Sequence, residues 1–349
     1  MVFHDYLTLI IPSIIGFVFT IIAAKFLMGY MMESGVTSPD HNKKGRPTLP
    51  AGVGLSVAIA FSIGILAYAF GVSAHIYGAV ADLTYLFATV LSIILISMVG
   101  LLDDINVKKE MVKSTDMMDT RKGLKQWYKP LMTIMGALPL MAVINSTGLD
   151  TLLIPFIGQV NFGLIYPLVI IPLAIIFTSN AFNLLGGFDG IATGTGFLAS
   201  LALLIYALVY GNYIGALLAS VLTAVLFAFL FFNIYPAKAI PGDSFTYGIG
   251  GAIIALMIIG NMESFGIVIF VPYIIEFIFH LPGRFNVTDL GKLQKDMTFN
   301  APYGKRINSW THVIMNMKKC KEYEVSTYMW LINIGFVVLA FVLKLFKLL

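Results

Sequence analysis

Long apolar runs recur along the whole chain and are separated by short polar connections. A helix that crosses a lipid bilayer needs about 20 apolar residues. The alternating pattern of about ten residues that is typical of barrel strands does not occur, and helices pair their own backbone groups inside a bilayer. We therefore predict an all-α chain with about ten transmembrane helices, at residues 6–31, 51–71, 83–102, 130–146, 163–184, 190–210, 213–235, 248–261, 264–281 and 327–348.

The composition indicates a polytopic membrane protein and excludes a soluble one. Of 349 residues, 58% are hydrophobic and 11% are charged, against about 45–50% and about 25% in soluble domains. The longest polar connection, 282–326, is too short for a separate soluble domain, so we expect one integral membrane domain over residues 1–349. The single cysteine, Cys320, excludes a disulfide framework and a cysteine-based zinc or iron–sulfur site.

The basic residues lie in alternate connections, which indicates an orientation. Nineteen of the 22 Lys and Arg residues fall in segments 32–50, 103–129, 236–248 and 282–326, all on one side of a ten-helix chain. By the positive-inside rule this side is cytoplasmic. We expect segment 147–162 to form a small extracytoplasmic hairpin. The first run lacks a small-residue cleavage site, so we expect a helix there and not a signal peptide.

Two adjacent acids, Asp103 and Asp104, end the third predicted helix on the cytoplasmic side. Carboxylates at a helix C-terminus oppose the helix dipole, at a cost of about 0.3–1 kcal/mol each, so stability does not explain them. Neighbours on a helix point about 100° apart, so the pair can address two ligands, a metal-bound diphosphate and a second substrate. The alternative is a solvated pair beside Lys108 and Lys109.

Two amides, Asn180 and Asn183, share one face at the inner end of the fifth predicted helix, and Asp189 follows the pair of glycines after them. An amide offers both a donor and an acceptor, which suits contacts with a metal, a sugar or a uracil ring. The alternative is ordinary helix termination, with Asp189 as the N-cap of the next helix.

Prolines end the seventh predicted helix, and Gly242-Asp243-Ser244 stands near the start of the eighth. Backbone N–H groups at a helix N-terminus point toward a bound anion, and a carboxylate among them can hold a divalent cation that a diphosphate shares. A helix cap at Asp243 or Ser244 is compatible with this function.

Basic side chains occur in the first and last cytoplasmic segments. His280 lies one turn after Glu276, and Arg284 follows, so His280 and Arg284 can bind phosphate, although a single histidine near a membrane surface is more often structural. Lys43, with Lys44 and Arg46 nearby, is equally explained as a topology signal. Together, these groups on one face describe a metal-assisted phosphoryl-transfer site at the membrane surface.

The order of these motifs resembles that of the polyprenyl-phosphate N-acetylhexosamine-1-phosphate transferases over nearly the whole chain. Asp103-Asp104 is similar to the aspartate pair of that family, and the segment from Asn180 to Asp189 to its asparagine motif. Gly242-Asp243-Ser244-Phe245 is similar to its Gly-Asp motif. The first cytoplasmic segment, from Asp40 to Lys43, resembles the opening motif of the eukaryotic and archaeal members, which act on dolichyl phosphate.

The resemblance implies a reaction of UDP-N-acetylglucosamine with a polyprenyl phosphate, giving the sugar diphospholipid and UMP, as the first step of lipid-linked oligosaccharide synthesis for N-glycosylation. It implies catalytic roles for Asp103, Asp104 and Asp243, and Mg²⁺, or Mn²⁺, held by Asp243 with help from Asn183. Asp103 would position or deprotonate the lipid phosphate, or act as a covalent nucleophile. The resemblance also implies contacts with substrate or phosphate for Lys43, Lys129, Asn180, Asn183, Asp189, Gly242, His280 and Arg284. Lys125 is the second choice for the role given to Lys129.

Some features depart from the family, and other functions stay open. Bacterial phospho-N-acetylmuramoyl-pentapeptide transferases have an aspartate where this chain has Gly186. Tyr235 stands where the family usually has an asparagine before Pro-Ala. The alternatives are the same reaction with another UDP-N-acetylhexosamine in cell-envelope synthesis, or a transporter, for which mid-helix polar residues are scarce. We expect a cell membrane location, or the endoplasmic reticulum if the chain is eukaryotic. We expect no nucleic-acid partner, and a homodimer is left open.

Overall fold

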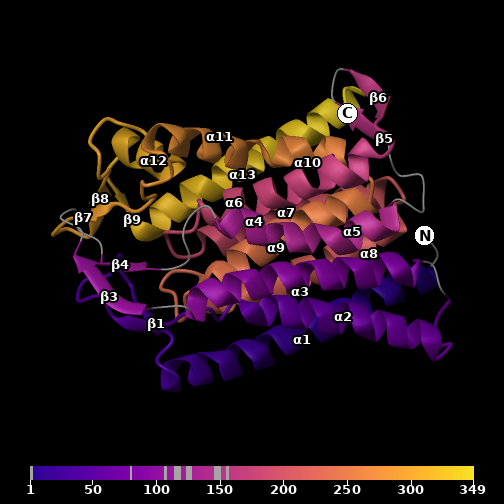
Figure 1. The fold of residues 1–349 in the computed structure, drawn as a ribbon, viewed down its shortest axis with the longest axis horizontal. Helices are drawn as coiled ribbons and strands as arrows, with labels where there is room; N and C mark the ends of the chain where they lie inside the picture. The colour runs from indigo at the N-terminus through magenta and orange to yellow at the C-terminus, as the bar shows by residue number, and fades with distance from the viewer. Residues whose placement is uncertain are drawn as a thin grey trace.

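The computed structural model describes residues 3–78, 81–105, 108–113, 119–122, 128–144, 151–154 and 157–349, and of 3–6, 108–113 and 119–122 the backbone alone. Most of the chain forms a bundle of helices that run along one common direction (Figure 1). The start of the first helix and the end of the last lie at one end of this bundle, and most of the short strands lie at the other.

The longer helices are α1 (Phe3–Glu33), α2 (Leu55–Ser73), α3 (Leu83–Ile105), α6 (Ile171–Asn183), α7 (Ile191–Val209), α8 (Tyr213–Asn233), α9 (Asp243–Ile259) and α13 (Glu322–Leu345). The shorter helices are α4 (Tyr128–Thr133), α5 (Ala137–Ile144), α10 (Glu263–Ile269), α11 (Val271–His280) and α12 (Trp310–Met317). Single turns of other helix types, η1 (Ile134–Gly136), η2 (Tyr166–Ile170) and η3 (Leu281–Gly283), join some of them.

The predicted all-α membrane architecture is confirmed. Among the described residues, seven helices are long and apolar enough to cross a bilayer, and α10 and α11 form a further pair bent by 52°. Pro272 stands in the first turn of α11, where it cannot donate a backbone hydrogen bond to the preceding turn. Residues 128–144 and 243–259 form shorter apolar helices. The number of complete spans therefore stays a prediction.

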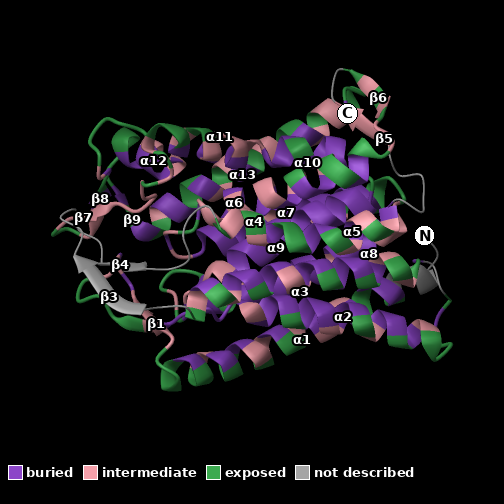
Figure 2. Ribbon diagram, viewed as in Figure 1, coloured by how far each residue is buried: buried purple, intermediate pink, exposed green. Residues whose placement is uncertain are grey.

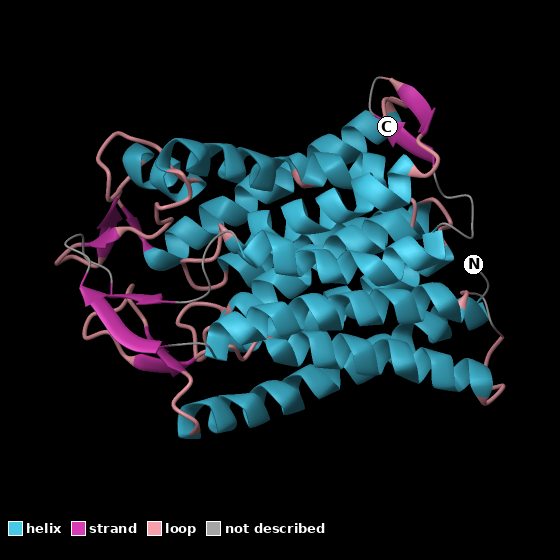
Figure 3. Cartoon of the chain, in the orientation of Figure 1, coloured by secondary structure: helices cyan, strands magenta, loops and turns pink. Residues whose placement is uncertain are grey.

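The strands are short and pair locally. They are β1 (Thr37–Pro39), β2 (Thr48–Pro50), β3 (Lys108–Lys113), β4 (Asp119–Lys122), β5 (Thr151–Ile154), β6 (Gly158–Asn161), β7 (Lys292–Leu293), β8 (Thr298–Asn300) and β9 (Cys320–Lys321). All pairs are antiparallel. β5 and β6 form the hairpin that the sequence predicts, at the end of the bundle opposite the other sheets (Figure 3). Its side of the membrane stays a prediction.

Glycines let α3 and α9 pack closely along the middle of the bundle, where buried residues concentrate (Figure 2). A Cβ atom on Gly251 would lie 2.3 Å from Ile96, and one on Gly248 would lie 2.2 Å from the Ser97 hydroxyl. A Cβ atom on Gly100 would lie 2.3 Å from the carbonyl oxygen of Asp243. Small residues permit such contacts between membrane helices. The seam therefore brings the end of α3 against the start of α9.

Candidate active site

Two carboxylates and one ammonium group meet where α3, α4 and α9 come together. Lys129 Nζ lies 2.5 Å from Asp103 Oδ2 and 3.2 Å from Asp243 Oδ2, and all three side chains are largely buried. Lys129, the first choice for the phosphate-binding lysine, thus contacts both carboxylates, and its contact with phosphate stays a prediction. Lys125, the second choice, lies outside the described residues. One lysine balances only one of the two carboxylates, so the group favours a further cation.

Asp104 is directed to a different partner. Its two oxygens accept hydrogen bonds from the backbone N–H groups of Asp243, at 2.7 Å, and Ser244, at 3.0 Å. Gly242 lies at φ +82° beside it, where a Cβ atom would lie 2.5 Å from Asp104 Oδ2. Asp104 thus caps α9, because a carboxylate satisfies the unpaired donors at a helix N-terminus.

This cap corrects one expectation. The sequence placed a bound phosphate at the N–H groups of Asp243 and Ser244, but these two groups face Asp104. The eighth apolar run begins at residue 248, and α9 begins earlier, at Asp243, in the Gly242-Asp243-Ser244 motif that the sequence places at the start of this helix. The cap extends the helix by holding its first turn. Gly242 leaves room for the Asp104 carboxylate, and its contact with substrate stays a prediction.

Asn180 and Asn183 on α6 connect the helices that carry Lys129 and Asp243. Asn183 Oδ1 accepts a 2.6 Å hydrogen bond from the Thr246 hydroxyl, one turn into α9. Asn180 Nδ2 lies 3.4 Å from Thr133 Oγ1, one turn after Lys129 on α4. The structure therefore brings Asp103, Asp243, Lys129 and the two amides together, as the sequence predicts.

The donors at this site suit a hard divalent cation. Within the described ranges, no three His, Cys, Asp or Glu side chains form a group that could hold a metal alone. Lys129 contacts the Oδ2 atom of both Asp103 and Asp243. Mg²⁺ is commonly bound by one or two carboxylates together with substrate phosphates and water. The residues therefore fit Mg²⁺ that a bound diphosphate helps to hold.

Lys43 forms a second buried ionic group. Its Nζ lies 2.7 Å from Asp189 Oδ2 and 3.3 Å from Asp40 Oδ2, and it also contacts Glu322. Burial lowers the pKa of Lys43, but the hydrogen bonds and charges of Asp189 and Glu322 outweigh this and raise it overall. Burial raises the pKa of Asp189 although Lys43 opposes the shift. Asp189 is not the N-cap of α7, because Gly190 holds that position.

The sequence analysis did not identify Glu322. Its Oε1 accepts hydrogen bonds from Asn42 Nδ2 and from the backbone N–H of Asp189, both at 3.3 Å. Glu322 therefore connects three parts of the chain, namely the segment between α1 and α2, the loop after α6, and α13. An acid in the first turn of a helix is expected for its favourable interaction with the helix dipole. No local pattern distinguishes this one.

His280 and Arg284 are placed differently. His280 is buried, and its Nδ1 lies 3.0 Å from the carbonyl oxygen of Glu276 on the same helix. Glu276 Oε2 accepts a 2.8 Å hydrogen bond from Trp310 N at the start of α12. Arg284 is exposed in a turn at φ +51°. His280 thus contacts Glu276 in the interior, whereas Arg284 lies at the surface, and their binding of phosphate stays a prediction.

Asp289 is a second residue that the sequence analysis missed. Its Oδ2 accepts hydrogen bonds from Gly186 N, at 3.2 Å, and Gly187 N, at 2.7 Å. A Cβ atom on Gly187 would lie 2.6 Å from Asp289 Oδ1. Burial raises the pKa of Asp289. Asp289 thus holds the loop between Asn183 and Asp189, which the sequence assigns to substrate binding.

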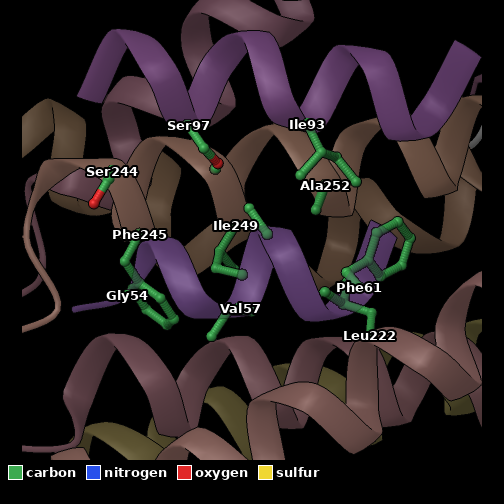
Figure 4. Close-up of a pocket in the computed structure, with 12 residues that line it drawn as sticks. Gly54, Val57, Phe61, Ile93, Ser97, Leu222, Ser244, Phe245, Ile249 and Ala252 are labelled. Atoms are coloured by element: carbon green, nitrogen blue, oxygen red, sulfur yellow. The ribbon is translucent and has the colours of Figure 1, made fainter. Parts of the chain in front are cut away.

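The core directly behind the start of α9 is nearly closed. A cavity of about 10 Å³ lies there among α2, α3, α8 and α9, and Ser97, Ser244 and Phe245 are among its lining residues (Figure 4). This volume is at the lower limit for one water molecule. Reactants therefore cannot reach Asp243 through this part of the bundle.

Known proteins are similar to this chain over most of its length. The pattern of glycosyl transferase family 4 matches residues 86–261. A Sulfolobus acidocaldarius protein named as a UDP-N-acetylglucosamine–dolichyl-phosphate N-acetylglucosaminephosphotransferase is 32% identical, with 97% of each chain covered. A Saccharolobus solfataricus protein of the same name is 31% identical, also with 97% of each covered.

A more distant relative, the phospho-N-acetylmuramoyl-pentapeptide-transferase of Halalkalibacterium halodurans, is 26% identical over 96% of this chain and 97% of its own. The matched segment, residues 86–261, contains Asp103, Lys129, Asn183 and Asp243. These similarities favour an enzyme over a transporter. The chain belongs to glycosyl transferase family 4.

Proposed function

We propose that this protein transfers N-acetylglucosamine-1-phosphate from UDP-N-acetylglucosamine to a polyprenyl phosphate of the dolichyl type and releases UMP. The observation that carries the proposal is the buried contact of Asp103 and Asp243 with Lys129. The names of the two archaeal relatives support the donor and the acceptor. The product would begin a lipid-linked oligosaccharide for N-glycosylation.

In the proposed reaction, an oxygen of the lipid phosphate attacks the phosphorus that carries the sugar. A new P–O bond forms, and the bond to the bridging oxygen breaks, so that UMP leaves with the electron pair. A phosphate monoester is largely dianionic near pH 7, so Asp103 has at most one proton to accept. Asp103 and Lys129 orient the acceptor, and the Lys129 ammonium offsets part of the phosphate charge.

Asp243 and Asn183 would hold Mg²⁺, with Mn²⁺ as an alternative. The bound cation would neutralise the diphosphate and the developing charge on UMP. Thr246 keeps the Asn183 amide oriented by its 2.6 Å hydrogen bond, and Asp104 holds the backbone of Asp243. Lys43 and Asp189 would contact the donor from the neighbouring ionic group.

We infer that the site faces the cytoplasm, because nineteen of the 22 basic residues lie in the segments on that side. The chain would then use the UDP-sugar of the cytoplasm at the cell membrane, or at the endoplasmic reticulum in a eukaryote. A homodimer, left open by the sequence, has no support from the fold or the relatives.

A donor panel tests the proposal. Purified protein is incubated with Mg²⁺, polyprenyl phosphates of several lengths, and radiolabelled UDP-sugars that differ in the hexosamine. We expect lipid-linked label and UMP release with UDP-N-acetylglucosamine. Preference for another UDP-N-acetylhexosamine would support the cell-envelope alternative. Absence of transfer from every donor to every acceptor would contradict the proposed reaction.

A further inference from the structure

A basic cavity lies outside the group formed by Asp103, Lys129 and Asp243. It has a volume of about 400 Å³ and is formed between residues 41–46 and residues 288–303. Sites for small molecules have volumes of about 300–1,000 Å³. Lys43, Lys44, Arg46 and Lys292 line it, and none of its lining residues in the described part of the chain is Asp or Glu.

Both walls of this cavity contact the loop that follows Asn183. On one wall, Lys43 binds Asp189 Oδ2 at 2.7 Å, and the adjacent Asn42 donates a 2.7 Å hydrogen bond to the carbonyl oxygen of Gly187. On the other wall, Leu290 lies close to Gly187. A Cβ atom on Gly187 would lie 2.6 Å from Leu290 Cδ2. The cavity therefore adjoins the loop that is assigned to substrate binding.

The cavity and the carboxylate group have opposite charge. Lys129 contacts the carboxylates of Asp103 and Asp243, so a phosphate that arrives there meets two carboxyl groups beside one ammonium group. In the cavity, Lys43 is neutralised by its carboxylate partners, whereas Lys44 is exposed and Lys292 is half-buried. A concave site lined by charges of one sign raises the local concentration of an oppositely charged substrate.

We propose that this cavity is an outer binding site for the diphosphate end of a nucleotide sugar, where the anionic donor is captured before it reaches Asp243. The inference rests on the proposed function for the identity of the donor. Free pyrophosphate has the same chemistry as the donor diphosphate. A binding experiment must therefore compare the two sources.

The test uses the full chain in detergent without added metal. Calorimetry measures the Kd of UDP-N-acetylglucosamine and of pyrophosphate for the wild type and for the double variant Lys44→Gln/Lys292→Gln. The control is Lys295→Gln/Lys305→Gln, which removes two exposed lysines of the same segment that do not line the cavity. For both ligands we expect the Kd of the cavity variant to be about tenfold higher than that of the wild type. The Kd of the control variant should stay within about twofold of the wild-type value. The difference should shrink as salt is added.

Unchanged binding by the cavity variant, or equal weakening by the control variant, would overturn the proposal. A weakening for pyrophosphate alone would show a site for free phosphate and also overturn capture of the donor. These results are separable from the proposed function. If the wild type transfers N-acetylglucosamine-1-phosphate and the cavity variant binds both ligands as tightly as the wild type, only the proposal about the cavity is refuted. A protein that shows the expected binding pattern but transfers no sugar refutes only the reaction.

Discussion

At the scale of single residues, two adjacent acids have separate tasks. Asp103 pairs with Lys129, whereas Asp104 accepts two backbone hydrogen bonds at the start of α9. The angle between neighbouring residues on a helix predicts that the two side chains point in different directions. The sequence does not show that Asp104 contacts the start of a helix 139 residues later in the chain. The same limit applies to Glu322, which lies 279 residues from Lys43.

The two acids should therefore fail differently when neutralised. Asp104→Asn weakens the cap of α9, and we expect it to lower the free energy of unfolding by about 1–2 kcal/mol and to reduce turnover as α9 shifts. Asp103→Asn leaves Lys129 paired with Asp243, so turnover should be lost with a smaller loss of stability. Thermal unfolding in detergent and a turnover assay measure both. Identical, mild defects in both variants would contradict this and would support the alternative that Asp103 and Asp104 are a solvated pair.

His312 gives a prediction about pH. Burial lowers its pKa to about 4, and the backbone N–H of Asn308 donates to its Nδ1 at 3.2 Å. Because the unfolded chain binds a proton near pH 6.5 and the folded chain does not, stability present above that pH is lost as the pH falls toward 4. Between pH 7 and pH 5 the wild type should lose about 1–2 kcal/mol more than His312→Asn. Parallel unfolding curves for the two proteins would contradict this.

At the scale of elements, the apolar runs predict most helices because burial in a bilayer requires them. The sequence predicts less well where helices are short or bent. Residues 130–146 were expected to form one regular helix, and in the described part, 128–144, the turn η1 interrupts the apolar helix between α4 and α5. The run 264–281 is divided by a bend of 52°. Pairing between distant segments, such as Asp289 with Gly186, leaves no periodic signal and could not be predicted.

The seam between α3 and α9 should be sensitive to a single methyl group. Gly100→Ala would place Cβ 2.3 Å from the carbonyl oxygen of Asp243, so we expect a loss of about 1–3 kcal/mol in stability and a marked loss of turnover. The matched control is Gly29→Ala on α1, where a Cβ atom would meet nothing within 4 Å. Unfolding temperatures and turnover are compared for both variants. Equal behaviour of the two would show that the close approach does not position Asp243.

At the scale of the whole molecule, most of the short strands lie at one end of the bundle, opposite the start of α1 and the end of α13 (Figure 1). This arrangement agrees with the sequence pattern, which places the basic segments on one side of the membrane. Cys320, the single thiol, is fully buried, and burial raises the pKa of its thiol. It is therefore a poor probe of sidedness.

An exposed thiol next to it tests the orientation. Lys319 is exposed, so the variant Lys319→Cys with Cys320→Ala should react with a membrane-impermeant maleimide in inverted vesicles and not in right-side-out vesicles. The wild type, with Cys320 alone, serves as the slow control on both sides. Labelling of the variant from outside intact cells would mean that the orientation or the number of spans is wrong.

We propose that Asp243 lies at the reaction centre of a metal-dependent sugar-phosphate transferase. The most direct measurement is transfer of label from UDP-N-acetylglucosamine to polyprenyl phosphate by the wild type and by Asp243→Asn, with Mg²⁺ and after its removal by a chelator. We predict that the chelator abolishes wild-type transfer, that Mg²⁺ restores it, and that folded Asp243→Asn remains at least about 100-fold slower with Mg²⁺. Near-normal Mg²⁺-dependent transfer by Asp243→Asn would contradict the claim.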